Sequence, residues 1–241
     1  MHIGMIYGEN RHFPPDIRLE KEIRALCSAG HRVTVLSKRL DNSIPEKERV
    51  LHENATVIRK YICNESSKLK LIIDRVQLRQ SNWVNEIINF TKTERPDVLH
   101  VHDFLMVPTV IDIAEKISVP VVADLHENMP AAVRAYRAGY SSFGKLKSAI
   151  LNNYYLMRWH EKRYLSRCER IIVVVPEAAE RLYKYGINPE NIIVVSNTED
   201  ETTFRFKPED AERIILENYS SRWAASYIGG IGPHRGLDTV L

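Results

Sequence analysis

The chain has 241 residues, and its hydrophobic fraction of 44% and charged fraction of 27% are those of an ordinary globular protein. Its net charge of +3 is too small for bulk binding to nucleic acid, so we expect no nucleic-acid partner. No apolar run reaches the ~20 residues of a membrane span and no signal peptide precedes the first strand, so we expect a cytoplasmic protein.

Short apolar strands alternate with amphipathic helices along the whole chain. The patterns predict, in chain order, a strand at 2–7, a helix that begins near 17, strands at 33–36 and 55–61, one long helix at 69–92, a strand at 95–103, a helix at 106–117, a strand at 119–124, a long helix at 145–168, a strand at 171–175, a helix that begins at 176, and strands at 192–195 and 224–228. Strands separated by helices imply right-handed crossovers and a parallel sheet. We therefore predict an α/β fold with a Rossmann-like, doubly wound parallel sheet.

Three residues mark the expected ends of helices. Asp16 has a side chain suited to an N-cap, and Gly30 stands where the glycine after a helix is expected. Pro176 stands at the expected first position of another helix. In the first helix, the apolar residues predicted to face the core include Ile17 and Ile23.

The long loop at 8–18 follows the first predicted strand. Ligands of doubly wound sheets bind beyond the carboxyl ends of the strands, so this loop is a candidate binding segment. Its length lets the backbone approach a ligand, and the guanidinium of Arg18 is suited to clamping an anion. The alternative is a rigid surface loop in which Asp16 acts only as a helix cap.

Two histidines and an aspartate stand at the end of the strand at 95–103. Period-two alternation places His100 and His102 on one face of the strand, just before Asp103. Metal binding is a weak hypothesis because a third strong ligand is missing and the three cysteines fit no metal spacing. Ligand contact or a structural hydrogen bond fits the pattern better, so we expect no metal.

The strand at 119–124 ends at Asp124, which is followed by His126 and Glu127. Asp124 shares a face with His126 if the extended backbone continues to that point. A histidine at a strand end can bond to a sugar hydroxyl or transfer a proton. The alternative is a histidine that only supports the fold.

Cations outnumber acids between 134 and 170, and aromatic residues are interleaved with them. The cations are Arg134, Arg137, Lys145, Lys147, Arg158, Lys162, Arg163, Arg167 and Arg170. Glu161 and Glu169 are the only acids in this stretch of the sequence. A basic, aromatic, amphipathic surface suits an anionic membrane, which would make the protein peripheral on its inner face. The alternative is a solvated helix with buried aromatic residues.

The sequence ends in an apolar strand, a glycine turn and the start of a helix. Gly229 and Gly230 follow the strand at 224–228, and Arg235 precedes the helix. Free N–H groups and the positive end of the helix dipole favour phosphate at such a turn. A nucleotide-binding domain needs roughly 100 residues, so this segment predicts an incomplete first βα unit of a second domain. We place the first domain at 1–205, a polar linker at 206–222 and the incomplete second domain at 223–241.

Several segments, taken in order, resemble the motifs of glycosyltransferase family 4, whose retaining enzymes have the GT-B architecture of two Rossmann domains. The segment at 13–36 resembles the opening of that family. The segment at 95–103 resembles its H-x-H-D strand, and 124–127 resembles its D-x-H-E turn. Three further segments resemble motifs of the family. They are 172–177 for V-x-x-S-E, 194–204 for V-x-N-G-x-D-x-x-x-F, and 227–237 for Y-x-G-x-x-x-x-x-K-G-L.

The resemblance implies roles for both domains. The first would hold the acceptor, and the second would hold a nucleotide-diphosphate sugar as donor substrate, with no further cofactor and no bound metal. His126 aligns with the active-site histidine that contacts the transferred sugar, so it is the catalytic candidate. Gly229, Gly230 and Arg235 would bind the donor diphosphate, which Gly8 would face across the cleft. The acceptor-binding or cleft candidates are Asp16, Arg18, His102, Asp103, Glu127 and Asn197.

The activity that the resemblance implies is hexosyl transfer with retention to a glycan or lipid-linked acceptor, in envelope polysaccharide or glycolipid synthesis. The second carboxylate motif of the family, E-x7-E, would lie beyond Leu241, so we expect no detectable transfer from these 241 residues. One alternative is a non-catalytic module that binds a glycan, a lipid or a partner. Another is a nucleotide-sugar epimerase of GT-B fold, against which the order of the motifs argues.

Overall fold

A computed structural model of the protein describes residues 1–62, 67–136, 153–198 and 227. The chain divides into two compact units, Met1–Ser196 and Asn197–Leu241, and the fold described here belongs to the first. The predicted linker at 206–222 lies outside the described residues, and so does the predicted strand at 224–228 apart from Tyr227. The predicted domain boundaries therefore stay predictions.

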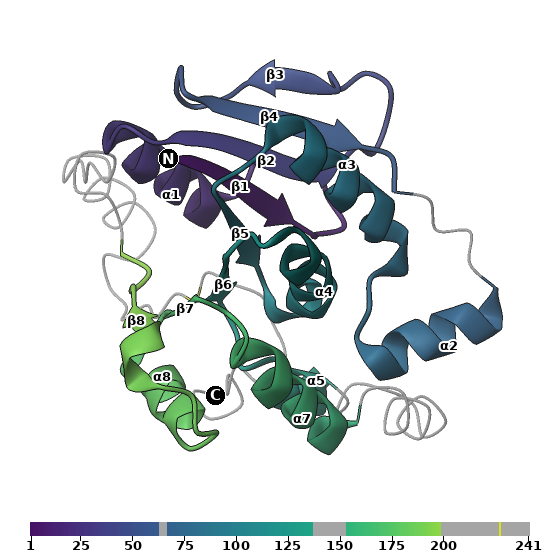
Figure 1. The fold of residues 1–241 in the computed structure, drawn as a ribbon, viewed down its shortest axis with the longest axis vertical. Coiled ribbons are helices and arrows are strands. Elements are labelled where there is room, and N and C mark those ends of the chain that lie inside the picture. Colours follow the sequence, from purple (N-terminus) through teal and green to yellow (C-terminus); the bar gives the residue numbers. More distant parts are fainter. Residues whose placement is uncertain (63–66, 137–152, 199–226, 228–241) are drawn as a thin grey trace, which may run out of the picture. The chain divides into compact units, whose positions relative to one another are not determined.

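Eight strands of the first unit form one sheet in the order β3-β4-β2-β1-β5-β6-β7-β8 (Figure 1). The strands are β1 (His2–Tyr7), β2 (Arg32–Lys38), β3 (Lys47–Arg49), β4 (Ala55–Lys60), β5 (Val98–His102), β6 (Val121–Leu125), β7 (Arg170–Val173) and β8 (Ile192–Val194). Every neighbouring pair is parallel except β3 and β4. The predicted Rossmann-like parallel sheet is confirmed, with one antiparallel strand added at its edge.

Helices and short 3-10 turns connect the strands. Among the described residues, the α-helices are α1 (Ile17–Ser28), α2 (Lys68–Gln77), α3 (Val84–Glu94), α4 (Val107–Ile117), α5 (Met129–Tyr136), α7 (Tyr154–Leu165) and α8 (Pro176–Tyr183). The 3-10 turns are η1 (Ser81–Trp83), η2 (Phe104–Met106) and η4 (Pro189–Asn191). Within the described ranges, no helix combines the length and the apolar character needed to cross a membrane.

Successive residues of β1 contribute to different hydrophobic cores. Met5 packs in one core with Leu19 of α1. Its neighbour Ile6 packs in the other core with Ile87 of α3 and Val110 of α4. Because side chains alternate along a strand, these two cores lie on opposite faces of the sheet. Coverage of both faces explains why the central strands β1, β5 and β6 are buried along almost their whole length.

The predicted helix ends at Asp16, Gly30 and Pro176 are confirmed. Asp16 caps α1, and its Oδ1 accepts the N–H groups of Arg18 and Leu19 at 3.2 and 3.3 Å. Gly30 has a φ of +84°, the left-handed conformation that ends many helices and that glycine adopts most easily. Pro176 is the first residue of α8, where its missing N–H costs no hydrogen bond.

The prediction of one helix at 69–92 is wrong in the middle of that range. α2 ends where Leu78 takes a left-handed conformation with a φ of 49°. The N–H of Arg79 donates to the carbonyl of Asp74 at 2.8 Å and closes the helix in a Schellman motif. η1 and α3 follow the break. Such a motif usually has glycine at the left-handed position, and without one the apolar pattern continues through the break.

Other details of the prediction also need correction. Ile17, expected to face the core, is 67% exposed, whereas Leu19 is 1% exposed. β3 was not predicted because Lys-Glu-Arg carries no apolar signal, and α5 was not predicted either. Of the helix predicted at 145–168, the described part is α7, since 145–152 lie outside the described residues.

Candidate functional site

The carboxyl ends of β1, β5 and β6 meet at one edge of the sheet, where a cavity of about 310 Å³ opens. This is the position at which doubly wound sheets bind ligands. The predicted site residues that line the cavity are Gly8, Arg18, His102, Asp103, His126 and Glu127. Three loops far apart in the sequence therefore converge on one cavity.

Asp103 turns the chain at the end of β5. Its φ of 65° and ψ of 143° form a combination that residues other than glycine rarely adopt. Its N–H donates to the carbonyl of Asp124 at 3.0 Å. The turn leads to Met106, whose Cγ would lie 2.2 Å from a Cβ added to Gly8. The loop after β1 can therefore approach this turn only because residue 8 is glycine.

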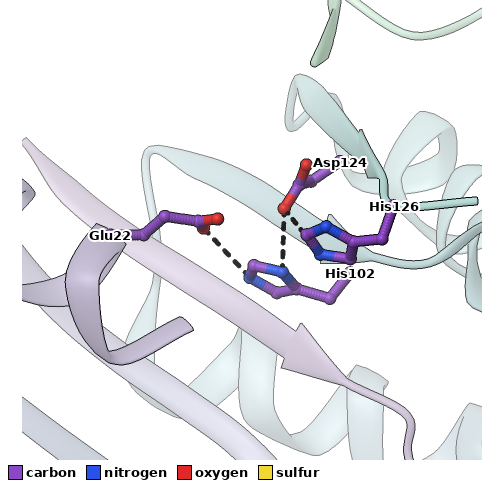
Figure 2. A group of neighbouring side chains, drawn as sticks. All are labelled: Glu22, His102, Asp124 and His126. Carbon is purple, nitrogen blue, oxygen red and sulfur yellow. Dashed lines mark ion pairs between the residues drawn. The ribbon is translucent and has the colours of Figure 1, made fainter. Parts of the chain in front are cut away.

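Asp124 stands between two histidines, as Figure 2 shows. Its Oδ2 lies 3.1 Å from Nδ1 of His102 and 3.0 Å from Nε2 of His126. Neither contact has the alignment of a hydrogen bond, so Oδ2 is a buried acceptor that is not fully satisfied. The side chain of Asp124 is 2% exposed, so its charge acts on the two rings with little screening by water.

The pKa values in this cluster follow from burial and from neighbouring charge. Burial opposes the charged form of Asp124, but the two histidines outweigh it and hold the pKa of Asp124 well below its usual range. Burial alone would lower the pKa of His126, but Asp124 outweighs it and the pKa is raised. Burial raises the pKa of Asp103 to about 6. Burial and the neighbouring His102 lower the pKa of His100 to about 3, so His100 is neutral.

Glu22 of α1 also belongs to this cluster, although sequence reasoning missed it. It lies four residues after Arg18, so both share one face of the helix, and that spacing is the signal that could have found it. Its Oε2 lies 3.8 Å from Nε2 of His102 and 3.9 Å from Nε2 of His100. Burial, followed by the charge of Asp124, raises the pKa of Glu22 to about 9.

A metal ion is one group that these side chains could hold. Glu22, His102, Asp124 and His126 each place one nitrogen or oxygen atom within 4.8 Å of the others, and the donor set suits a divalent ion such as zinc. However, His102 faces Glu22 through Nε2 and Asp124 through Nδ1 (Figure 2), and one ion can take only one of these nitrogens. These contacts fit a row of side chains that runs through the His102 ring better than a set of ligands around one ion.

The structure does not place the remaining candidates in the cavity. Asp16 does not line the cavity; besides capping α1, it accepts the hydroxyl of Tyr7 at 3.0 Å and Nη2 of Arg11 at 2.7 Å. Asn197 is exposed and belongs to the second unit. The predicted phosphate-binding residues lie outside the described residues: Gly229, Gly230 and Arg235.

Gln80 lines the cavity although no motif pointed to it. It follows the break at Leu78, and its N–H donates to Oγ1 of Thr109 on α4 at 2.8 Å. A continuous helix at 69–92 would not have had this connection. The break in the helix, which the periodicity did not reveal, therefore contributes to the wall of the site.

The sequence comparisons identify the family. Residues 19–201, more than half of the chain, match Glycosyltransferase Family 4. The chain therefore belongs to glycosyltransferase family 4, and the resemblance of its motifs is confirmed. No curated protein matches the chain.

Solved structures with this fold include GT-B glycosyltransferases. Sucrose-phosphate synthase (tll1590) from Thermosynechococcus elongatus has a TM-score of 0.64 at 13% identity, over 89% of this chain and 52% of that one. Arabidopsis thaliana UGT89C1 complexed with UDP-L-rhamnose has a TM-score of 0.51 at 15% identity, over 90% and 54%. Anabaena Alr3699/HepE in complex with UDP-glucose has a TM-score of 0.51 at 12% identity, over 90% and 49%. The chain thus spans about half the length of these proteins and has the fold of half of a GT-B enzyme.

Proposed function

We propose that this chain is the acceptor-side part of a retaining glycosyltransferase that transfers a hexose from a nucleotide-diphosphate sugar to a glycan or lipid-linked acceptor. Family membership and one feature of His126 support the proposal. Nε2 of His126 faces Asp124, whereas its Nδ1 is buried without a hydrogen-bond partner among the described residues. That nitrogen can bond to a sugar hydroxyl in the cavity. The presence of UDP-glucose in the HepE structure supports the donor class.

In this proposal four polar side chains of the cavity have a task. The raised pKa of His126 favours an imidazolium that donates to the hydroxyl of the sugar. The leaving diphosphate gains negative charge in the transition state, and Arg18 brings a cation to the same cavity. Asp103 and Glu127 accept hydroxyl groups and orient the sugars. Gly229, Gly230 and Arg235 would complete the diphosphate site.

A transfer assay with a panel of nucleotide-diphosphate sugars tests the proposal. We expect no detectable transfer from the 241 residues. If the reading frame continues past Leu241 for about 130 residues or more, enough for a domain, and carries the paired-glutamate motif, the longer product should turn over. In that product, His126→Ala should lower kcat by about 10² to 10⁴. His31→Ala, a histidine away from the cavity, is the matched control.

Three results would change the proposal. Multiple turnover by the 241-residue chain would remove the need for a donor half. An unchanged kcat in His126→Ala would remove the role of His126. A genuine stop after Leu241, together with sugar binding and no transfer, would favour the non-catalytic binding module.

We also propose that α2 and α7 form a surface that docks on an anionic membrane. Nε2 of His160 lies 2.8 Å from the carbonyl oxygen of Val76 and joins the two helices. Trp159 on α7 is 51% exposed, and the guanidinium of Arg163 lies 5.1 Å from the centre of its ring. The exposed apolar side chains of α2 are Leu69, Leu71, Ile72, Ile73 and Val76. Apolar groups beside cations are the combination that binds an anionic interface.

Not every cation of the predicted basic stretch belongs to this surface. Arg167, expected to face little opposition, pairs with Glu115 of α4 at 2.6 Å and with Asp112 at 3.2 Å. Arg170 pairs with Glu169 at 3.2 Å. Counting the acids between 134 and 170 missed the partners of Arg167 because those partners are on α4, which lies outside that range. Lys162 and Arg163 are the exposed cations to be tested.

Pelleting with phosphatidylserine-containing vesicles tests this surface. We expect binding at low salt that disappears with Lys162→Glu combined with Arg163→Glu, and that weakens with Ile72→Asn. Lys184→Glu, at the residue that follows α8, is the matched control for charge. Absence of binding at low salt, or equal binding to pure phosphatidylcholine vesicles, would contradict the proposal.

A further inference from the structure

Two carboxyl groups approach each other at the carboxyl edge of the sheet, Glu22 from α1 and Asp124 from β6. Oε2 of Glu22 and Oδ2 of Asp124 are both buried without a hydrogen-bond partner. Both residues belong to the set whose donor atoms lie within 4.8 Å of one another. Two carboxylates at this spacing repel, whereas one proton between them removes the repulsion and satisfies both oxygens.

We propose that Glu22 is protonated at neutral pH and is a positioning residue for His126, because it donates a hydrogen bond that holds the Asp124 carboxylate against His102 and His126. The proposal rests on the proposed function only in taking His126 as the residue that meets the sugar. The state of the proton and the chemistry of transfer can therefore be tested separately.

The distances around His102 fit one charged and one neutral carboxyl group. Nδ1 of His102 lies 3.1 Å from Asp124, whereas its Nε2 lies 3.8 Å from Glu22. An ionised Glu22 would compete with Asp124 for this ring. A neutral Glu22 leaves the ring with Asp124. Figure 2 marks the contacts of Glu22 with His102, of His102 with Asp124 and of Asp124 with His126.

The charged and titratable groups around Glu22 and around His126 agree with that assignment. Those that face Glu22 are His100 and His102 of β5, Asp124 of β6, and Asp16 and Arg18 at the start of α1. Those that act on His126 are Asp124, Asp103 and Arg18. His100 is neutral, so it does not offset the two acids. Among the described residues, Arg18 is a cation that favours an ionised Glu22, and burial with Asp124 outweighs it.

The first test follows the carboxyl carbons of the 241-residue chain by NMR across pH, with Glu22→Gln to assign the signal. We expect Glu22 to titrate near pH 9 and Asp124 to remain ionised below its usual range. Titration of Glu22 near its ordinary pKa of 4.5 would overturn the proposal. One divalent ion per chain by elemental analysis would also overturn it, because the ion would replace the proton.

The second test compares two substitutions at Glu22. Glu22→Gln keeps a neutral donor, so the ring pKa of His126 should stay at the wild-type value, whereas Glu22→Ala should change it. A shift in Glu22→Gln as large as that in Glu22→Ala would overturn the proposal, because the charge of Glu22 and not its donor would then matter.

The third test uses the longer, active product. Glu22→Ala should lower kcat about tenfold to a hundredfold with an unchanged KM for the donor, and Glu22→Gln should restore it. Above pH 9 the wild-type rate should fall and the Glu22→Gln rate should not. A rate in Glu22→Gln as low as that in Glu22→Ala would overturn the positioning role. Absence of transfer with the expected NMR titration would overturn the proposed function and leave the assignment of the proton standing.

Discussion

Two clusters of buried charge in the first unit are built differently. On α7, the Glu161 side chain is 1% exposed and is bonded by both terminal nitrogens of Arg181 on α8, one of them at 3.0 Å. At the carboxyl edge, Asp124 is 2% exposed and faces His102 and His126. One carboxylate has a permanent cation as its partner, and the other has partners whose charge depends on pH.

This difference separates a structural cluster from the cluster that we propose to be functional. Arginine keeps its charge at every physiological pH, so the Glu161 pair joins α7 to α8 and has no second state. Histidine exchanges protons near neutrality, so the Asp124 cluster can respond to a ligand. Substitutions in the first cluster should change the free energy of unfolding, and those in the second should change its pH dependence.

The largest expected effect is on the structural cluster. Arg181→Met leaves Glu161 buried without its cation and should lower the free energy of unfolding by about 3–5 kcal/mol. Urea unfolding followed by circular dichroism measures the loss. The double variant Glu161→Gln with Arg181→Met should recover most of it. A loss no larger than that of an exposed pair would break the contrast between the clusters.

Asp124→Asn should cost less, about 1–3 kcal/mol, because the partners of Asp124 are histidines. Because folding lowers the pKa of Asp124, this residue stabilises the folded state above its ordinary pKa of 3.8, and the stabilisation is lost as the pH falls. Because folding raises the pKa of His126, this residue stabilises the folded state below its ordinary pKa of 6.5, and the stabilisation is lost as the pH rises. The difference from wild type should therefore be greatest between these two values. A constant difference across pH would contradict the assignment.

Glu22→Gln should produce a smaller effect of opposite sign. The folded state keeps a proton on Glu22 up to about pH 9, whereas the unfolded chain releases it near 4.5, so wild-type stability should fall as pH rises between these values. Glu22→Gln removes this decline. After discounting for the 28% exposure of the Glu22 side chain, we expect the free energy of unfolding of Glu22→Gln, relative to wild type, to rise by about 1 kcal/mol from acidic to alkaline pH. Parallel stability profiles would contradict a protonated Glu22.

Arg167→Ala should have the smallest effect. Its guanidinium contacts both carboxylate oxygens of Glu115 at 2.7 and 2.6 Å, but the Glu115 side chain is 54% exposed. Exposed pairs contribute about 0–1 kcal/mol, so urea unfolding should detect little change, and less at high salt. A loss comparable to that of Arg181→Met would show that burial is not what distinguishes the pairs.

The alternation of apolar strands with amphipathic helices was enough to predict the parallel sheet, because each element carries its own periodicity. It was also enough to place the ends of β1, β5 and β6 at one edge, where Arg18, His102 and His126 meet. The helix caps at Asp16 and Pro176 were predictable because capping depends on a few neighbouring residues.

Contacts between distant residues depended on the tertiary structure. β3 consists of three charged residues and is a strand only because β4 offers it an edge. The break at Leu78 brings Gln80 to the cavity, and the fold brings Arg181 to Glu161, 20 residues away in the sequence. The proximity of Glu22 to Asp124, 102 positions later, depends on how α1 packs on the sheet. Local periodicity and capping are properties of neighbouring residues, whereas the pairing of buried polar groups depends on which elements the hydrophobic cores hold together.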